Sequence, residues 1–161
     1  MIIDVNQSML ERAKAEMKEF DEQKTHNKFV CAHNYIGLLG EMMYDEYLTS
    51  LGADYQWVEF CKKGWNQPDF VLGEGYSVDV KTTYTNDLWF TSPKFDVYIL
   101  MMLTRDNKKM NIKGYMTRQQ LLKAIEDGTA KKVVQGNRTS YCLPSEHIKP
   151  HNLKMMMREM A

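Results

Sequence analysis

The chain has 161 residues, of which 43% are apolar and 26% are charged, a composition typical of one globular domain with a buried core. Lys plus Arg and Asp plus Glu both number 21, so the net charge is zero, which argues against a protein held on nucleic acid by bulk charge alone. The start, MIIDVNQS, resembles no signal peptide, and the longest apolar run, residues 97–103, is too short to span a membrane. We therefore expect a single cytoplasmic domain over residues 1–161, with no membrane partner.

Cysteines and histidines give no metal or disulfide pattern. The three cysteines, Cys31, Cys61 and Cys142, are odd in number and far apart, so we expect reduced thiols. The four histidines have spacings that match no zinc site, and we interpret them as surface or capping residues: His26, His33, His147 and His151.

Helices are predicted at both ends of the chain and strands in the middle. Helical periodicity covers residues 7–24 and then 34–51, where Gly52 ends the helix. Thr117 is expected to cap a helix that ends at Gly128, and residues 152–160 look helical. Strands are expected at 55–60, 69–72, 76–82, 88–91 (weaker), 96–103, 110–116 and 140–144. This order predicts an α+β arrangement, or α/β with a mixed sheet, in which helices flank a central sheet.

The stretch QPDFVLGEGYSVDVKTT, residues 67–83, places charged residues inside two apolar strands. A three-residue loop, Gly-Glu-Gly, pairs Phe70 with Val78 and sets Asp69 opposite Asp79. Because side chains alternate along a strand, Asp69, Asp79 and Lys81 then share one face, and the apolar residues share the other. A two-residue loop would separate the two acids and spoil the apolar face.

Two facing carboxylates repel each other, so this arrangement needs compensation. Lys81 can offset one charge, and a divalent cation such as Mg²⁺ or Mn²⁺ could offset both. A cation held in this way can activate water and stabilise charge on a phosphate, with the lysine assisting. The alternative is a hairpin with one solvent-exposed face, whose charged residues have no functional role.

At these residues the sequence resembles the PD-(D/E)xK nuclease superfamily, which includes restriction endonucleases and archaeal-type Holliday junction resolvases. The match is Pro68-Asp69 followed by Asp79-Val80-Lys81 after a short hairpin. It covers about residues 34–116. The later segments IKGYMTRQQL and YCLPSEHIKP also look like phage-borne members. The resemblance implies a restriction endonuclease-like fold with a mixed central β-sheet, and, for a phage-encoded protein, a location in the host cytoplasm.

The resemblance also implies a set of site residues. In such nucleases a glutamate on the preceding helix often completes the site, and Gly40-Glu41 lies on the corresponding helix here. A helical wheel puts Glu41 at the edge of the apolar stripe, where it could point at the sheet. The implied metal ligands are Glu41, Asp69, Asp79 and the carbonyl of Val80, and Lys81 is the implied catalytic lysine.

Basic and aromatic residues elsewhere are weaker candidates. Basic clusters occur at Lys62-Lys63, from Arg105 to Lys113, and at Lys131-Lys132 with Arg138; we interpret them as solvated loops, with Lys62 and Lys63 as the best candidates for phosphate contacts. Trp65, Trp89 and Phe90 could stack on bases, although Trp89 and Phe90 are expected to fill the core and its rim.

The favoured hypothesis is a Mg²⁺-dependent DNA nuclease, with a role in phage DNA processing, repair or recombination. The alternatives are a nucleic-acid-binding or regulatory protein on the same fold without chemistry, and a protein–protein module whose charged face is incidental. A homodimer is compatible with the nuclease hypothesis, since cutting two strands often uses two sites.

Overall fold

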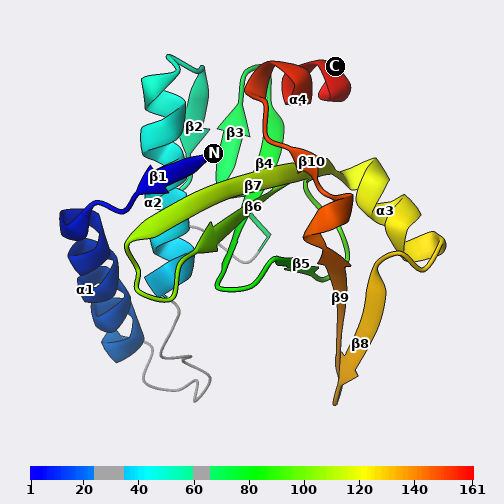
Figure 1. Ribbon diagram of the computed structural model, residues 1–161, viewed down its shortest axis with the longest axis horizontal. Coiled ribbons are helices and arrows are strands. Elements are labelled where there is room, and N and C mark those ends of the chain that lie inside the picture. The colour runs from blue at the N-terminus through cyan, green and yellow to red at the C-terminus, as the bar shows by residue number, and fades with distance from the viewer. Residues whose placement is uncertain (24–34, 60–65) are drawn as a thin grey trace.

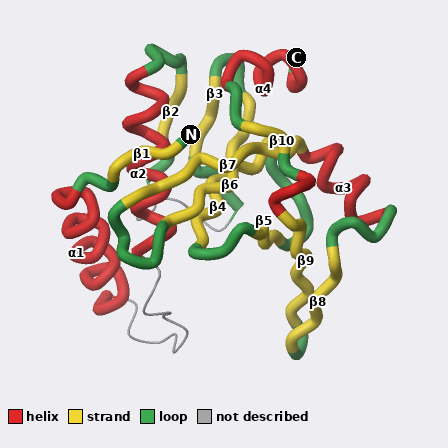
Figure 2. The backbone as a smooth tube through the Cα atoms, in the orientation of Figure 1, coloured by secondary structure: helices red, strands yellow, loops and turns green. Residues whose placement is uncertain are grey.

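A computed structural model describes residues 1–23, 35–59 and 66–161 (Figures 1 and 2). In chain order the elements are β1 (Ile2–Asp4), α1 (Gln7–Gln23), α2 (Tyr35–Ser50), β2 (Tyr55–Trp57), β3 (Phe70–Leu72), β4 (Tyr76–Thr83), β5 (Asp87–Phe90), β6 (Val97–Leu103), β7 (Lys109–Thr117), α3 (Arg118–Glu126), β8 (Lys131–Gln135), β9 (Arg138–Pro144), the short 3-10 helix η2 (Ser145–His147), β10 (Lys149–Pro150) and α4 (Leu153–Met160). The mixed α+β organisation is confirmed. Each predicted helix and strand corresponds to an element of the same type, and β1, β8 and β10 are additional.

The strands form two sheets. The larger sheet has the order β1-β7-β6-β4-β3-β2, and β10 also pairs with β7. Strands β4 and β6 run parallel, whereas the other pairs in this sheet are antiparallel, so the sheet is mixed as expected. The smaller sheet has the order β5-β9-β8 and was not anticipated. It means that the weakly predicted strand β5 does not extend the larger sheet.

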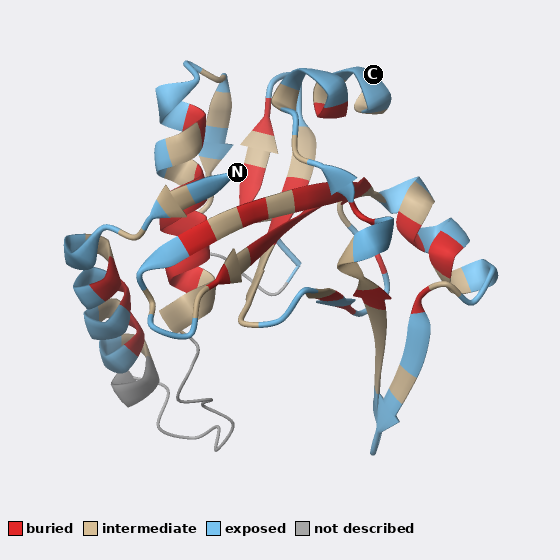
Figure 3. Ribbon diagram, in the orientation of Figure 1, coloured by how far each residue is buried: buried red, intermediate tan, exposed pale blue. Residues whose placement is uncertain are grey.

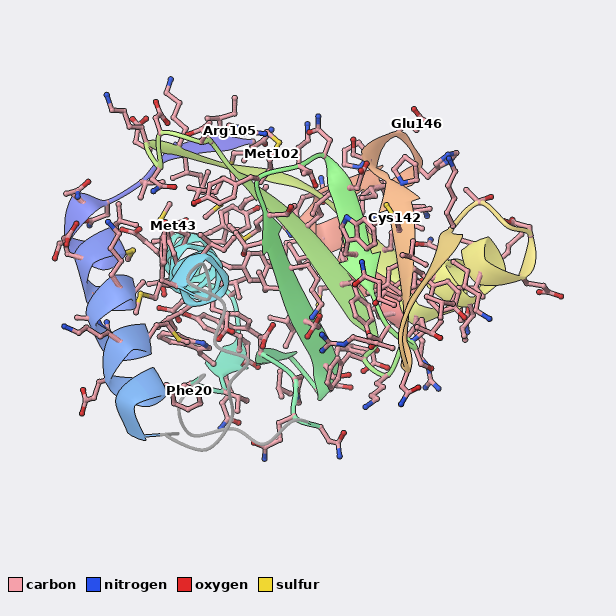
Figure 4. The ribbon with its side chains drawn as sticks, turned by 90° about the horizontal axis from the view of Figure 1, so that it is seen from below. Phe20, Met43, Met102, Arg105, Cys142 and Glu146 are labelled. Carbon is pink, nitrogen blue, oxygen red and sulfur yellow. The ribbon has the colours of Figure 1, made fainter. Side chains whose placement is uncertain are left out.

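The larger sheet lies between two hydrophobic cores. On one face its apolar side chains pack against α1, α2 and α4, and this core contains the predicted apolar face of the hairpin, including Phe70, Val78 and Val80. The opposite face, at Tyr98 and Leu100, packs against α3 and the smaller sheet. Figure 4 shows the two sides seen from below, with α1 and α2 on one side of the sheet and β8, β9 and α3 on the other. Figure 3 shows buried residues concentrated in the central strands and on the inner faces of α1 and α2.

Helix ends follow the sequence signals. Thr117 caps α3 as predicted, in a capping box in which its side chain accepts a hydrogen bond from the Gln120 backbone N–H and the Gln120 side chain accepts one from the Thr117 backbone N–H. Gly52 and Gly128, which follow α2 and α3, both have positive φ. No helix in the described ranges is long and apolar enough to cross a membrane.

The structure corrects the interpretation of His151. This histidine is half-buried among tyrosines: Nε2 lies 3.1 Å from the Tyr44 hydroxyl and Nδ1 lies 3.5 Å from the Tyr47 hydroxyl. Burial, and to a lesser degree the charge of the chain's N-terminal amine, lowers the pKa of His151 to about 4. His147 is exposed as expected, whereas His26 and His33 lie outside the described residues.

Two further expectations concern thiols and basic residues. Cys142 has a free thiol, and Cys31 and Cys61 lie outside the described residues.

The basic residues from Lys131 onward lie on strands β8 and β9, not on a loop, because these segments pair as a hairpin. Part of the Arg105–Lys113 cluster likewise belongs to β7.

Candidate functional site

The hairpin between β3 and β4 has the predicted register. Phe70 pairs with Val78, and Leu72 pairs with Tyr76. Gly73 and Gly75 in the connecting loop have φ values of 51° and 120°, a region that a residue with a Cβ rarely adopts. The loop length therefore fixes which side chains share a face, as the sequence indicated.

Asp69 departs from ideal pairing in a way that shapes the site. Strand β3 begins one residue later, and the Asp69 backbone N–H donates to Val78 O at 2.9 Å, while its carbonyl accepts from Val58 N at 2.8 Å. The Val80 N–H donates to Asp69 Oδ2 at 2.6 Å, so a carboxylate oxygen takes the place of a backbone acceptor. This bond anchors the Asp69 side chain next to β4 and close to Asp79.

Asp79 and Lys81 form an ion pair. Lys81 Nζ lies 2.6 Å from Asp79 Oδ2, and the side chains are 40% and 9% exposed, respectively. Burial acts to lower the pKa of Lys81, but the charge and hydrogen bond of Asp79, followed by the charge of Asp69, outweigh it and leave the pKa above its ordinary value. Lys81 is therefore an ammonium at neutral pH.

Helix α2 brings Glu41 to the same place. Gly40 packs directly on β4, where a Cβ would overlap the Oγ1 of Thr82 and lie 2.9 Å from its Cβ, so only glycine permits this approach. Glu41 is the next residue; it is buried, and its Oε2 accepts a hydrogen bond from Trp57 Nε1 at 3.1 Å. The predicted orientation of Glu41 toward the sheet is borne out.

The acids line one cleft of about 630 Å³. Glu41, Asp69 and Asp79 are 4%, 5% and 7% exposed, so they lie at its floor. The same cleft is bordered by residues of β5, of β9 and of the loop before β6. Its lining includes Val80, Lys81, Tyr98, Trp89, Phe90, Thr91, Ser92, Lys94, Arg138 and Ser140.

The carboxylates do not converge as a preformed metal cluster. Within the described ranges, no three His, Cys, Asp or Glu side chains are arranged to hold a metal ion. Protein donors hold oxygens of all three acids: Trp57 binds Glu41, the Val80 N–H binds Asp69, and Lys81 binds Asp79. In chemical type, however, three carboxylates lining one cleft are the donor set that a hard divalent cation takes.

The remaining candidates from the sequence are basic and aromatic residues. Lys62, Lys63 and Trp65 lie outside the described residues. Phe90 fills the second core as expected, whereas Trp89 is exposed and lines the cleft. Side chains alternate along β5, so a buried Phe90 implies that its neighbour Trp89 points to the opposite face.

A comparison with known protein families and with curated proteins found no match for this chain.

Proposed function

We propose that this protein is a metal-dependent nuclease that hydrolyses phosphodiester bonds in DNA, on a restriction endonuclease-like arrangement of the larger sheet. One observation carries the proposal: Glu41, Asp69 and Asp79 come from a helix and from both sides of a hairpin, yet they line one cleft together with Lys81. This combination of three carboxylates and a lysine is more specific than the short sequence motif.

Glu41, Asp69 and Asp79 would hold Mg²⁺ or Mn²⁺, with the carbonyl of Val80 as a further ligand. When bound, the cation supplies stabilisation of negative charge on a phosphate oxygen and activation of water. Asp79 would contribute a carboxylate oxygen to the cation, and Lys81, whose Nζ lies 2.6 Å from Asp79 Oδ2, would supply a positive charge to the same part of the cleft. The ion pair therefore holds both groups close to where the chemistry needs them.

Lys81 acts as a fixed positive charge in this scheme. Burial acts to lower the pKa of Lys81, but the charge of Asp79 outweighs it in the ion pair, so the amine is held as an ammonium beside the acids. An ammonium beside the scissile phosphate stabilises the charge that develops in the transition state.

The test is cleavage of a panel of linear, branched and circular DNAs by the purified protein, with Mg²⁺, with Mn²⁺ and with EDTA. We expect cleavage that requires the divalent cation and that Asp69→Asn abolishes. Absence of cleavage on every substrate, with the fold intact by circular dichroism, would contradict the proposal.

The second candidate is a nucleic-acid-binding or regulatory protein that uses the same cleft without chemistry. The carboxylate arrangement favours it, because Asp79 is already paired with Lys81 and the acids do not converge. Titration with Mn²⁺ separates the candidates: the nuclease binds the cation and loses that binding on Glu41→Gln, whereas the silent protein binds DNA equally well with and without the cation.

A further inference from the structure

The smaller sheet presents one face to solvent beside the cleft, and the register of its strands identifies the residues on that face. Trp89 of β5 lies opposite Cys142 of β9, and Cys142 lies opposite Lys131 of β8. Paired residues share a face and alternate residues along a strand return to it, so Ser140 and Arg138 of β9 also belong there. By the same rule Asp87 of β5 and Val133 and Gln135 of β8 lie on this face. We call the part of it formed by Trp89, Lys131, Arg138, Ser140 and Cys142 the outer face of the smaller sheet.

Trp89 is exposed for a structural reason. Its neighbours on β5 point inward: Leu88 is fully buried, and Phe90 is 3% exposed and contacts Tyr98 of β6. Trp89 must therefore point outward, and it is 44% exposed while lining the cleft. A large planar ring at the rim of a cleft whose floor is acidic is suited to stack on another planar ring.

Two basic residues line the same cleft as Trp89. Arg138 lines the cleft from β9, and Lys94 lines it from the loop that precedes β6. Tyr98 fixes that loop, because its hydroxyl oxygen accepts a hydrogen bond from the Lys94 backbone N–H at 2.8 Å. The Lys94 side chain is bonded to a neutral partner, Asn66 Oδ1, at 3.2 Å, so its charge remains available to an anion.

We propose that the outer face of the smaller sheet binds a single-stranded segment of DNA, with one base stacked on Trp89 and adjacent phosphates contacted by Arg138 and Lys94. The proposal rests on the proposed function, since it assigns the form of the substrate that reaches the same cleft. Lys131, on the same face two strands from Trp89, extends the path for the phosphate backbone beyond the cleft.

The size and chemistry of the cleft favour single-stranded DNA over duplex DNA. In a duplex both faces of an internal base are covered by its neighbours, so a side chain can stack only on an unpaired or terminal base. The cleft of about 630 Å³ is in the size range of sites for small organic ligands, which matches one or two nucleotides. The nearly buried acids at its floor are reached by a strand that enters the cleft, not by one that passes over it.

Binding of a fluorescent single-stranded oligonucleotide, measured by anisotropy in EDTA and again in Ca²⁺, tests the proposal without requiring cleavage. Trp89→Leu keeps an apolar side chain but lacks a planar face, and we expect it to weaken binding by roughly 5- to 150-fold. Trp89→Tyr should retain most of the affinity, and Val134→Ala, which trims an exposed apolar residue of the same sheet, should retain all of it. Thermal melting verifies that each variant is folded.

A series of oligonucleotides with one abasic site at successive positions identifies the stacked base. With the parent protein, one position should cost as much affinity as Trp89→Leu does, and with the Trp89→Leu variant that position should cost little more. Arg138→Gln should lower the affinity for all sequences. It should also reduce the slope of the logarithm of affinity against the logarithm of salt concentration by about one.

The outcomes separate this inference from the nuclease proposal. If the parent protein cleaves DNA but Trp89→Leu binds single strands normally in both buffers, the stacking inference is wrong and the nuclease proposal stands. If binding depends on Trp89 and no cleavage occurs, the nuclease proposal is wrong and the binding face stands. If the parent protein binds no single-stranded DNA in either buffer, or binds duplex more tightly, the inference is overturned.

Discussion

Replacing Lys81 by methionine separates stability, metal binding and turnover in one variant. Methionine keeps most of the side-chain volume and loses the charge, so the packing around β4 should change little. The substitution leaves Asp79, whose side chain is 9% exposed, without the ammonium 2.6 Å away. Breaking a buried pair by removing one partner costs about 3–5 kcal/mol, but Lys81 is 40% exposed and solvent screens the pair, so we expect a loss of about 1–2 kcal/mol in EDTA.

A divalent cation should recover that loss. The carboxylates are unchanged, and removal of a nearby positive charge favours binding of a cation. Saturating Mn²⁺ should therefore raise the melting temperature of Lys81→Met by more than that of the parent protein. Turnover should still fall by about 100-fold or more, because the ammonium acts where charge builds up in the transition state.

The assays are calorimetric melting with EDTA and with Mn²⁺, and single-turnover DNA cleavage. Lys18→Met, at an exposed position on α1, is the matched control and should alter neither. Unchanged turnover in Lys81→Met would refute the assigned role and leave Lys81 as a charge-balancing residue. A smaller Mn²⁺ shift than in the parent protein would refute the electrostatic argument.

Three further predictions follow from the site and the fold. Mn²⁺ at about a hundred times its dissociation constant should stabilise the parent protein by about 2.7 kcal/mol, and equal melting midpoints with EDTA and Mn²⁺ would exclude the metal site. Asp79→Asn should abolish cleavage with little change in melting temperature, because the amide keeps the shape and can still accept from Lys81; an unfolded variant would indicate a structural role. Because the pKa of His151 falls from 6.5 to about 4 on folding, stability should be full above about pH 6.5 and decline by up to about 3 kcal/mol as the pH falls to 4. Urea unfolding at several pH values should show this decline in His147→Gln and lose it in His151→Gln.

The register of the hairpin at the site could be predicted because the loop length and the alternation of apolar residues both specify it. Only one loop length puts Phe70, Val78 and Val80 on one face, and the observed pairing of Phe70 with Val78 is the one that this length predicts. Glu41 became a candidate through the resemblance, and helical periodicity placed it at the edge of the apolar stripe. The bond between Asp69 and the Val80 N–H, in contrast, depends on where β3 begins, which periodicity does not specify.

The smaller sheet could not be predicted for physical reasons. Strand β8 is exposed along most of its length, with only Val133 half-buried, so it lacks the apolar alternation that marks a strand. Strand β10 has two residues and β1 has three, too few for any periodicity. The partner of β5 lies far along the chain, and no local pattern reports a distant pairing. Stacking of a base on Trp89 was one of the possibilities that the sequence offered, but the place of Trp89 at the cleft depends on the pairing of β5 with β9, which the sequence did not reveal.

The separation in sequence between the strands of the smaller sheet also affects the order of folding. Strand β5 ends at Phe90 and its partner β9 begins at Arg138, whereas Asp69 and Asp79 are brought together by a tight hairpin. Local contacts form faster than contacts that close long loops. During synthesis on the ribosome, both strands of the acidic hairpin emerge before β9, so the smaller sheet that carries Trp89, and with it the cleft, is completed only after β9 has emerged. A chain truncated before β9 would display the acids without the surface that we propose guides a strand to them.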